Sequence, residues 1–66
     1  MTQKLLRLRA VEDCTGLSRS VIYRMMKNHE FPAPIRLTSR AVAWVAEDVD
    51  GWIKNRITDS RGGVRQ

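Results

Sequence analysis

Five polar or basic side chains share one side of a segment that has the composition of a helix. The segment runs from Arg19 to Asn28 without Gly or Pro. At about 100° per residue, its polar members fall within an arc of roughly 140°, and they are Arg19, Ser20, Tyr23, Arg24 and Lys27. Guanidinium, ammonium and hydroxyl groups donate hydrogen bonds to phosphate oxygens and to base edges. The pattern therefore predicts non-covalent contacts with a polyanion.

The other side of this segment is apolar. Val21, Ile22, Met25 and Met26 fall within an opposite arc of similar width, so this side suits a protein core. Ser18 precedes the segment, and its hydroxyl can accept a hydrogen bond from an open backbone N–H, which predicts a helix start at this residue. Taken alone, the basic side is also explained as a solvated helix surface.

A shorter helix is expected just before this segment. Residues 5–8 favour an extended chain, and residues 9–16 favour a brief helix whose apolar side is formed by Ala10, Val11 and Cys14. Gly16 is suited to the left-handed conformation that often ends a helix. Cys14 is expected to be a small buried hydrophobe. A helix, a tight turn containing Gly and a second helix with a basic outer side indicate a helix-turn-helix.

A β-hairpin is expected after the second helix. Pro32 and Pro34 cannot continue a helix. Residues 35–45 then alternate apolar with polar side chains and are rich in β-branched and aromatic types, with a turn at Thr38-Ser39-Arg40. Arg36, Ser39 and Arg40 would lie near the tip of this hairpin. Such a hairpin corresponds to the wing of a winged helix, which would reach phosphate or the minor groove.

The last predicted element is a helix over residues 47–57. Val49, Trp52 and Ile53 share one side of it, and the acidic residues at its start suit the positive end of the helix dipole. Trp44 and Trp52 are expected in the core. Residues 58–66 predict a disordered polar tail. The fold expected for residues 1–57 is mainly α with a small β-hairpin, a winged helix-turn-helix made of a short helix, a recognition helix, a two-stranded wing and a C-terminal helix.

Composition excludes several classes of function. A chain of 66 residues has room for one domain. One Cys and one His provide neither a disulfide nor a Cys/His zinc site, and no carboxylate pair, nucleophile–base set or phosphate loop is present. No apolar run approaches the roughly 20 residues of a membrane span. We therefore expect a non-enzymatic cytoplasmic protein, associated with the nucleoid, without cofactor, metal, membrane or small-molecule ligand.

The distribution of charge points to one class of partner. The formal net charge is +5 at pH 7. Residues 15–45 carry five cations against a single acid, Glu30, whereas residues 46–66 are nearly balanced. An excess of positive charge in the middle of the chain favours a polyanion such as double-stranded DNA.

Several motifs together resemble the AlpA-type prophage regulators, small relatives of the MerR-like winged helices and of phage excisionases. The matching features are "TGLSRS-IYR", an "FP-P" break, "RAVAW" and "EDVD-WI". The resemblance implies a DNA-binding transcription regulator of a prophage or integrated element. It places the recognition helix at residues 18–28, with Arg19, Ser20, Tyr23 and Arg24 on its contact side, and matches Arg40 to an arginine that the family keeps after the wing turn.

Two departures and two alternatives accompany this resemblance. Thr38-Ser39 stands where the family often has Gly-Pro or Gly-Gly at the wing turn, and Glu47-Asp48 replaces Ser-Glu, which leaves Asp48 as the candidate helix cap. One alternative function is an excision factor that bends attachment-site DNA, with an integrase or further copies of itself on repeated sites as partners. The other is an adaptor whose basic side binds an acidic protein.

Overall fold

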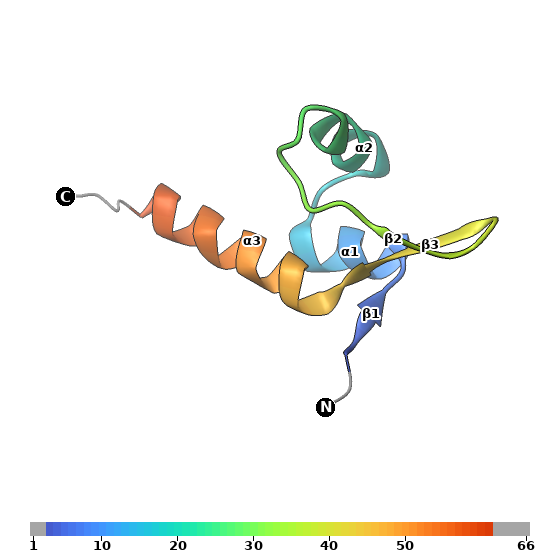
Figure 1. Cartoon of the computed structure of the whole chain (residues 1–66). Helices are drawn as coiled ribbons and strands as arrows, with labels where there is room; N and C mark the ends of the chain where they lie inside the picture. The colour runs from blue at the N-terminus through green and yellow to red at the C-terminus, as the bar shows by residue number, and fades with distance from the viewer. Residues whose placement is uncertain (1–2, 62–66) are drawn as a thin grey trace.

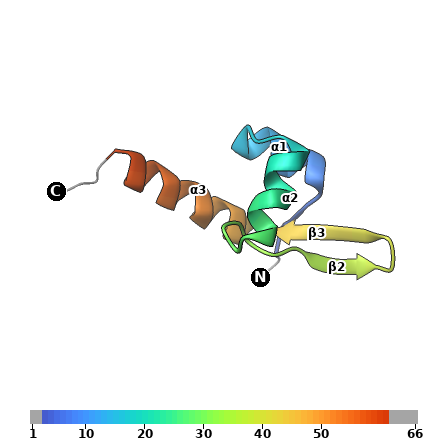
Figure 2. The same cartoon turned by 90° about the horizontal axis from the view of Figure 1, so that it is seen from above.

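Six short elements make up the part of the chain that the computed structural model describes, residues 3–61. These elements are three strands and three helices, and a hairpin of two of the strands projects away from the helices, as Figure 1 shows. In chain order the elements are β1 (Leu5–Leu6), α1 (Leu8–Thr15), α2 (Arg19–Lys27), β2 (Ile35–Thr38), β3 (Ala41–Val45) and α3 (Ala46–Ser60). The hairpin and the far end of α3 project to opposite sides, and α2 lies between them in both views (Figures 1 and 2). The predicted winged helix-turn-helix arrangement is confirmed.

The sheet has one strand more than the predicted wing. Its order is β1-β3-β2, and both pairs are antiparallel. Residues 5 and 6 pair with the end of β3, in the register Leu5↔Val45 and Leu6↔Trp44. The backbone N–H of Ala46 donates to the carbonyl of Lys4 at 2.8 Å and extends this pairing. The extra strand satisfies backbone groups of β3 that a two-stranded hairpin would leave unpaired.

The core is small and takes one residue from almost every segment. Its buried members are Val11, Ile22, Phe31, Trp44 and Val49. The indole N–H of Trp44 donates to the carbonyl of Pro32 at 3.0 Å, so the largest buried side chain is also hydrogen-bonded. Trp52 is half-buried and packs on this core. The expectation that both tryptophans belong to the core is confirmed.

Cys14 is exposed, which corrects the prediction that it is buried. Leu8 and Val11 pack into the core from α1, and the hydroxyl of Thr15 donates to the carbonyl of Val11 at 2.8 Å. On a helix these three residues define the inward side, and Cys14 lies about 60° around from Val11. The apolar members of α1 spread over more of its circumference than the core covers.

Both ends of α3 differ from the sequence-based boundaries. The helix begins at Ala46, directly after β3, with Val45 at the N-cap position and no side-chain cap. Asp48 is therefore not the cap and lies in the first turn beside Glu47. At the other end the helix continues through Ser60, so residues 58–60, assigned above to a tail, are helical. Residues 62–66 lie outside the described residues.

Two glycines predict opposite effects of substitution by alanine. Gly16 follows α1 with φ +75°, a left-handed conformation in which a Cβ is strained. Gly51 lies inside α3, and a Cβ built there meets no atom within 4 Å. We expect Gly51→Ala to stabilise the fold by about 0.5–1 kcal/mol and Gly16→Ala to destabilise it by about 1 kcal/mol. Thermal unfolding followed by circular dichroism measures both, and a lowered Tm for Gly51→Ala would contradict this assignment.

Candidate nucleic-acid interface

The second helix of the helix-turn-helix is fixed at both ends. Ser18 adopts an extended conformation, and its hydroxyl accepts a hydrogen bond from the backbone N–H of Val21 at 3.3 Å, as predicted for the N-cap. At the C-terminal end, His29 has φ +60°, and the N–H of Glu30 donates to the carbonyl of Met25 at 2.7 Å. This bonding pattern is that of a Schellman motif. It turns the chain so that Phe31 enters the core.

The division of α2 into two sides is present as predicted. Ile22 is buried and Val21, Met25 and Met26 are half-buried, whereas the polar members are all exposed, namely Arg19, Ser20, Tyr23, Arg24 and Lys27. The guanidinium of Arg19 lies 5.9 Å from the centroid of the Tyr23 ring. This distance is at the outer limit of a cation–π contact. We refer to these five residues, together with the capping Ser18, as the α2 basic side.

No carboxylate in the described part of the chain forms an ion pair with the cations of α2. Within residues 3–61 the one ion pair joins Lys54 and Asp50 of α3 at 3.0 Å. The acidic residue nearest in sequence to the α2 cations is Glu30, beyond the end of the helix. Three exposed positive charges on one helix side therefore remain available to an anionic partner.

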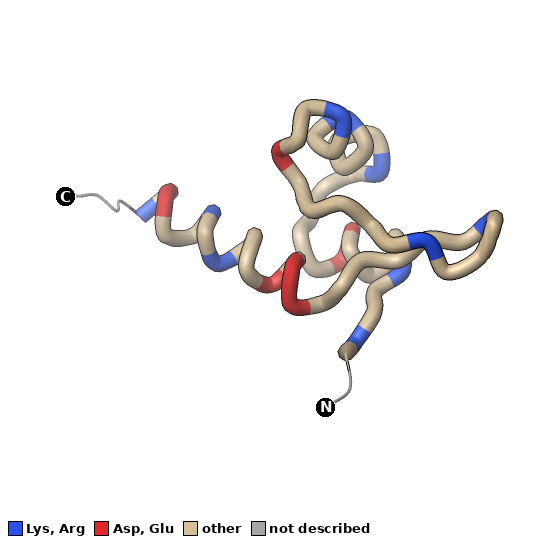
Figure 3. The backbone as a smooth tube through the Cα atoms, viewed as in Figure 1, with Lys and Arg blue, Asp and Glu red and all other residues tan. Residues whose placement is uncertain are grey.

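The hairpin forms a second, separate basic area. Arg36, Ser39 and Arg40 are exposed, and β2 and β3 meet at a turn over residues 39–40, close to the predicted position. The hydroxyl of Thr38 accepts a hydrogen bond from the backbone N–H of Arg40 at 3.1 Å. This side-chain bond shapes the turn between β2 and β3. Figure 3 shows Lys and Arg on both α2 and the hairpin, while α3 carries a mixture of both signs.

All four residues of β2 are exposed, although apolar and polar residue types alternate along this strand. The alternation of Ile35 and Leu37 with Arg36 and Thr38 is typical of an antiparallel strand with one covered face. Neither Ile35 nor Leu37 is among the side chains that pack against the core. Sequence reasoning also left Lys4, Arg7 and Arg9 unassigned. All three are exposed, and their signal was a run of cations without an acid.

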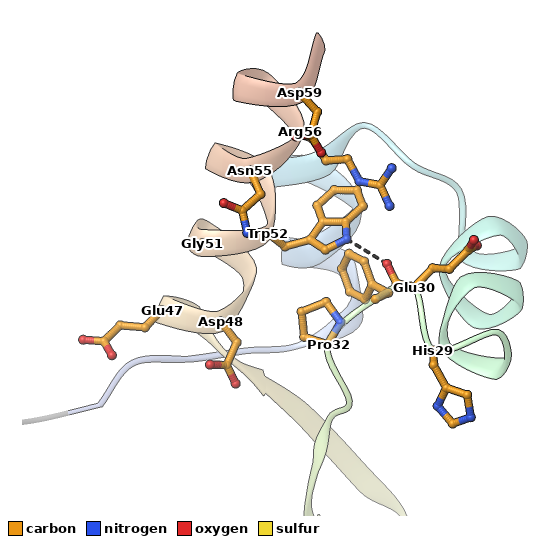
Figure 4. A pocket seen from close by; sticks show the side chains of 11 residues that line it. His29, Glu30, Pro32, Glu47, Asp48, Gly51, Trp52, Asn55, Arg56 and Asp59 are labelled. Carbon is orange, nitrogen blue, oxygen red and sulfur yellow. Dashed lines mark hydrogen bonds between the residues drawn. The ribbon is translucent and has the colours of Figure 1, made fainter. Parts of the chain in front are cut away.

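A shallow groove lies between α3 and the loop that follows α2 (Figure 4). Contacts among the residues that line it join these two parts of the chain. The indole N–H of Trp52 donates to the carbonyl of Glu30 at 2.8 Å, and its ring meets Phe31 edge-on at 4.9 Å between centroids. The guanidinium of Arg56 lies over the Trp52 ring, 4.7 Å from its centroid. These contacts anchor the end of α2 and leave its basic side free. No described group of three or more acidic, His or Cys side chains within residues 3–61 could hold a metal ion.

The interface is thus a two-part surface on a small helical scaffold. In the described region no helix has both the length and the apolar character needed to cross a membrane. The two basic areas lie on elements that the core fixes in place, α2 through Ile22 and the hairpin through the Trp44 end of β3. Exposed cations, a phenol and hydroxyls on such a scaffold are suited to phosphate and base-edge contacts.

Two comparisons show which known proteins this chain is similar to. An uncharacterised protein, ORF88 of Enterobacteria phage P4, is 36% identical over 61 residues, which cover 92% of this chain and 69% of the phage protein. The profile of the family described as "Prophage CP4-57 regulatory protein (AlpA)" matches residues 4–57. This match includes every described helix and strand except the last turn of α3. The chain belongs to the AlpA family of prophage regulatory proteins.

Proposed function

We propose that this regulatory protein acts as a sequence-specific DNA-binding transcription regulator of a prophage or integrated element. In this proposal α2 enters the major groove, where Arg19, Ser20, Tyr23 and Arg24 meet base edges and Lys27 meets phosphate. The hairpin then lies over the backbone or the minor groove, with Arg36, Ser39 and Arg40 as its contacts. The protein would act at the nucleoid, and no catalytic step is part of this function.

One observation carries the proposal: the α2 basic side is exposed, positively charged and without carboxylate partners within the described residues. An adaptor for an acidic protein would use the same charges. Protein interfaces, however, draw most of their energy from buried aromatic or arginine anchors. On this side only Tyr23, 40% exposed, offers an aromatic ring. A polyanion is a better fit, because phosphate binding needs charge and hydrogen-bond donors rather than an apolar pocket.

Binding to DNA is expected to depend steeply on salt. Neutralising about five phosphates releases counterions and gives a slope of log K against log [salt] near −4.5. The slope is measured by fluorescence anisotropy with a labelled duplex over a series of salt concentrations. A slope close to zero, with binding retained, would contradict phosphate contact by the two basic areas.

A gel-shift series on tiled fragments tests the function itself. The fragments cover the DNA that flanks the gene of this protein and any neighbouring integrase gene, with random duplex as competitor. We expect one or a few fragments within a promoter to bind more tightly than random DNA by about 10³-fold or more. Preference for the attachment site instead, together with altered excision in a recombination assay, would assign the protein to excision. Equal binding to all fragments, or none, would overturn the proposal.

A further inference from the structure

The wing contains an exposed apolar residue that makes no contact with the core. Leu37 is 44% exposed and does not pack against the core. Single exposed apolar residues are common and need no explanation by themselves. Leu37 differs because of where it lies: on the projecting hairpin, in an edge strand, and between the two arginines of the wing, Arg36 and Arg40.

The backbone sets Leu37 apart from its neighbours on β2. Arg36 pairs with Val42 and Thr38 pairs with Ala41, two adjacent positions of β3. The register therefore shifts between Arg36 and Thr38, and Leu37 has no partner on β3. A residue added in this way is a β-bulge, which bends and twists its strand and redirects a side chain. Ile35, on the same strand, pairs regularly with Ala43.

The surroundings of Leu37 indicate what it would contact. The hairpin from Ile35 to Val45 contains no acidic residue, so its charge suits a polyanion. The wing turn adds a hydroxyl, Ser39, and the exposed side chain of Arg40. Proteins that bind the minor groove combine Arg side chains with apolar wedges such as Leu or Ile, which enter between base pairs and bend the duplex.

On this basis, and resting on the DNA-binding function proposed above, we propose that Leu37 is an apolar wedge for the minor groove. Arg36 and Arg40 hold the phosphates on either side, and the Leu37 side chain enters the groove at a base step between them. Flexible pyrimidine–purine steps such as TA and CA yield most readily to a wedge. Leu37 would then add shape-dependent specificity to the sequence that α2 reads, and it would kink the DNA beside the major-groove site.

The chain provides a matched control for this role. Ile35 is 41% exposed, nearly the same as Leu37, and lies two residues away on the same strand. Its regular pairing keeps it within the sheet, nearer the body of the molecule. Replacing Ile35 with alanine removes a similar amount of apolar surface from the wing. Replacing Leu37 with methionine keeps a flexible apolar side chain at the bulge.

The test uses the full chain and the tightest-binding fragment from the gel-shift series, labelled at both ends for energy transfer. Wild-type protein and Leu37→Met are expected to bend this duplex by about 20–90°. Leu37→Ala is expected to lose most of the bend and about tenfold in affinity, whereas Ile35→Ala keeps the bend. A 2-aminopurine placed at the wing site, located by hydroxyl-radical footprinting, should brighten with wild-type protein and not with Leu37→Ala.

Each outcome separates this inference from the function on which it rests. If wild-type protein binds the fragment specifically without bending it, or if Leu37→Ala bends it as wild-type does, the wedge is wrong and the regulator function stands. Equal loss in Leu37→Ala and Ile35→Ala would also overturn it, because general apolar contact would then explain both. If wild-type protein binds no duplex, the regulator function fails and the wedge fails with it. Circular dichroism of each variant establishes that it is folded.

Discussion

Trp44→Ala is expected to leave this protein largely unfolded at 37 °C. Trp44 is fully buried, and truncating a buried Trp to Ala costs about 3–5 kcal/mol. Stabilities of about 0.05–0.15 kcal/mol per residue give a chain of this length only about 3–10 kcal/mol in total. The substitution also removes the indole N–H that donates to the carbonyl of Pro32.

Far-UV circular dichroism and urea unfolding measure this effect. Trp44→Phe is the control, because it keeps a buried aromatic ring and loses only the indole bond and part of the volume. We expect Trp44→Phe to remain folded with a lower midpoint, by about 1–2 kcal/mol in unfolding free energy. A Trp44→Ala protein that melts within a few degrees of the parent would show that the core lies elsewhere.

Arg24→Ala and Arg19→Ala are each expected to weaken specific DNA binding by about 1–3 kcal/mol, or about 5- to 150-fold. Both side chains are exposed, so neither substitution removes a core contact, and the fold should be retained. An arginine that reads a base edge contributes to the preferred sequence alone, whereas a phosphate contact contributes to every sequence. The same titrations on random duplex distinguish the two roles.

Lys54→Ala is the matched control for these arginines. It removes one positive charge from α3, far along the chain from the α2 basic side, and disrupts only an exposed pair with Asp50. Such pairs contribute about 0.3–0.5 kcal/mol to stability. Lys54→Ala should therefore change DNA affinity by less than about twofold, a modest effect of net charge. If it weakens binding as much as Arg24→Ala, then binding follows overall charge and α2 has no special role.

The two helices of the helix-turn-helix could be predicted because local signals agree there. Ser18 caps α2 and Gly16 ends α1, and both conclusions come from a few neighbouring residues. The strict separation of apolar and basic sides on α2 leaves only one way to bury it. Where the signal was broader, as around Cys14 on α1, the sequence did not determine which part of the apolar arc faces the core.

Features that depend on distant parts of the chain could not be predicted in the same way. The sequence predicts an extended chain at Leu5 and Leu6, but two residues have no periodicity that would show their pairing with the end of β3. Leu37 alternates with Arg36 and Thr38 in the sequence, a pattern typical of a strand with one covered face. The hairpin projects beyond the helices, and β2 is exposed along its whole length among residues 3–61. The exposed Leu therefore became evident only from the arrangement in space.

The residues of the candidate site also differ in whether local sequence patterns could predict their placement. The residues of the α2 basic side follow from the sequence, because one helix holds them all and helical geometry is regular. The wing residues depend on the register of the hairpin, in which the bulge after Arg36 shifts every later position by one. Turn residues such as Thr38, Ser39 and Arg40 could be placed near the tip. The sequence could not show that the bulge leaves Leu37 without a partner on β3.

The junction between the sheet and α3 has a mechanical consequence. β3 ends at Val45 and α3 begins at Ala46, so no loop separates them, and the hydrogen bond to the carbonyl of Lys4 fixes the first residue of the helix. We therefore expect β3 and α3 to move together as one rigid unit. A tilt of the hairpin relative to the helices would then displace the C-terminal end of α3. A fluorescent dye on the last turn of α3 would therefore report a change in the position of the hairpin tip.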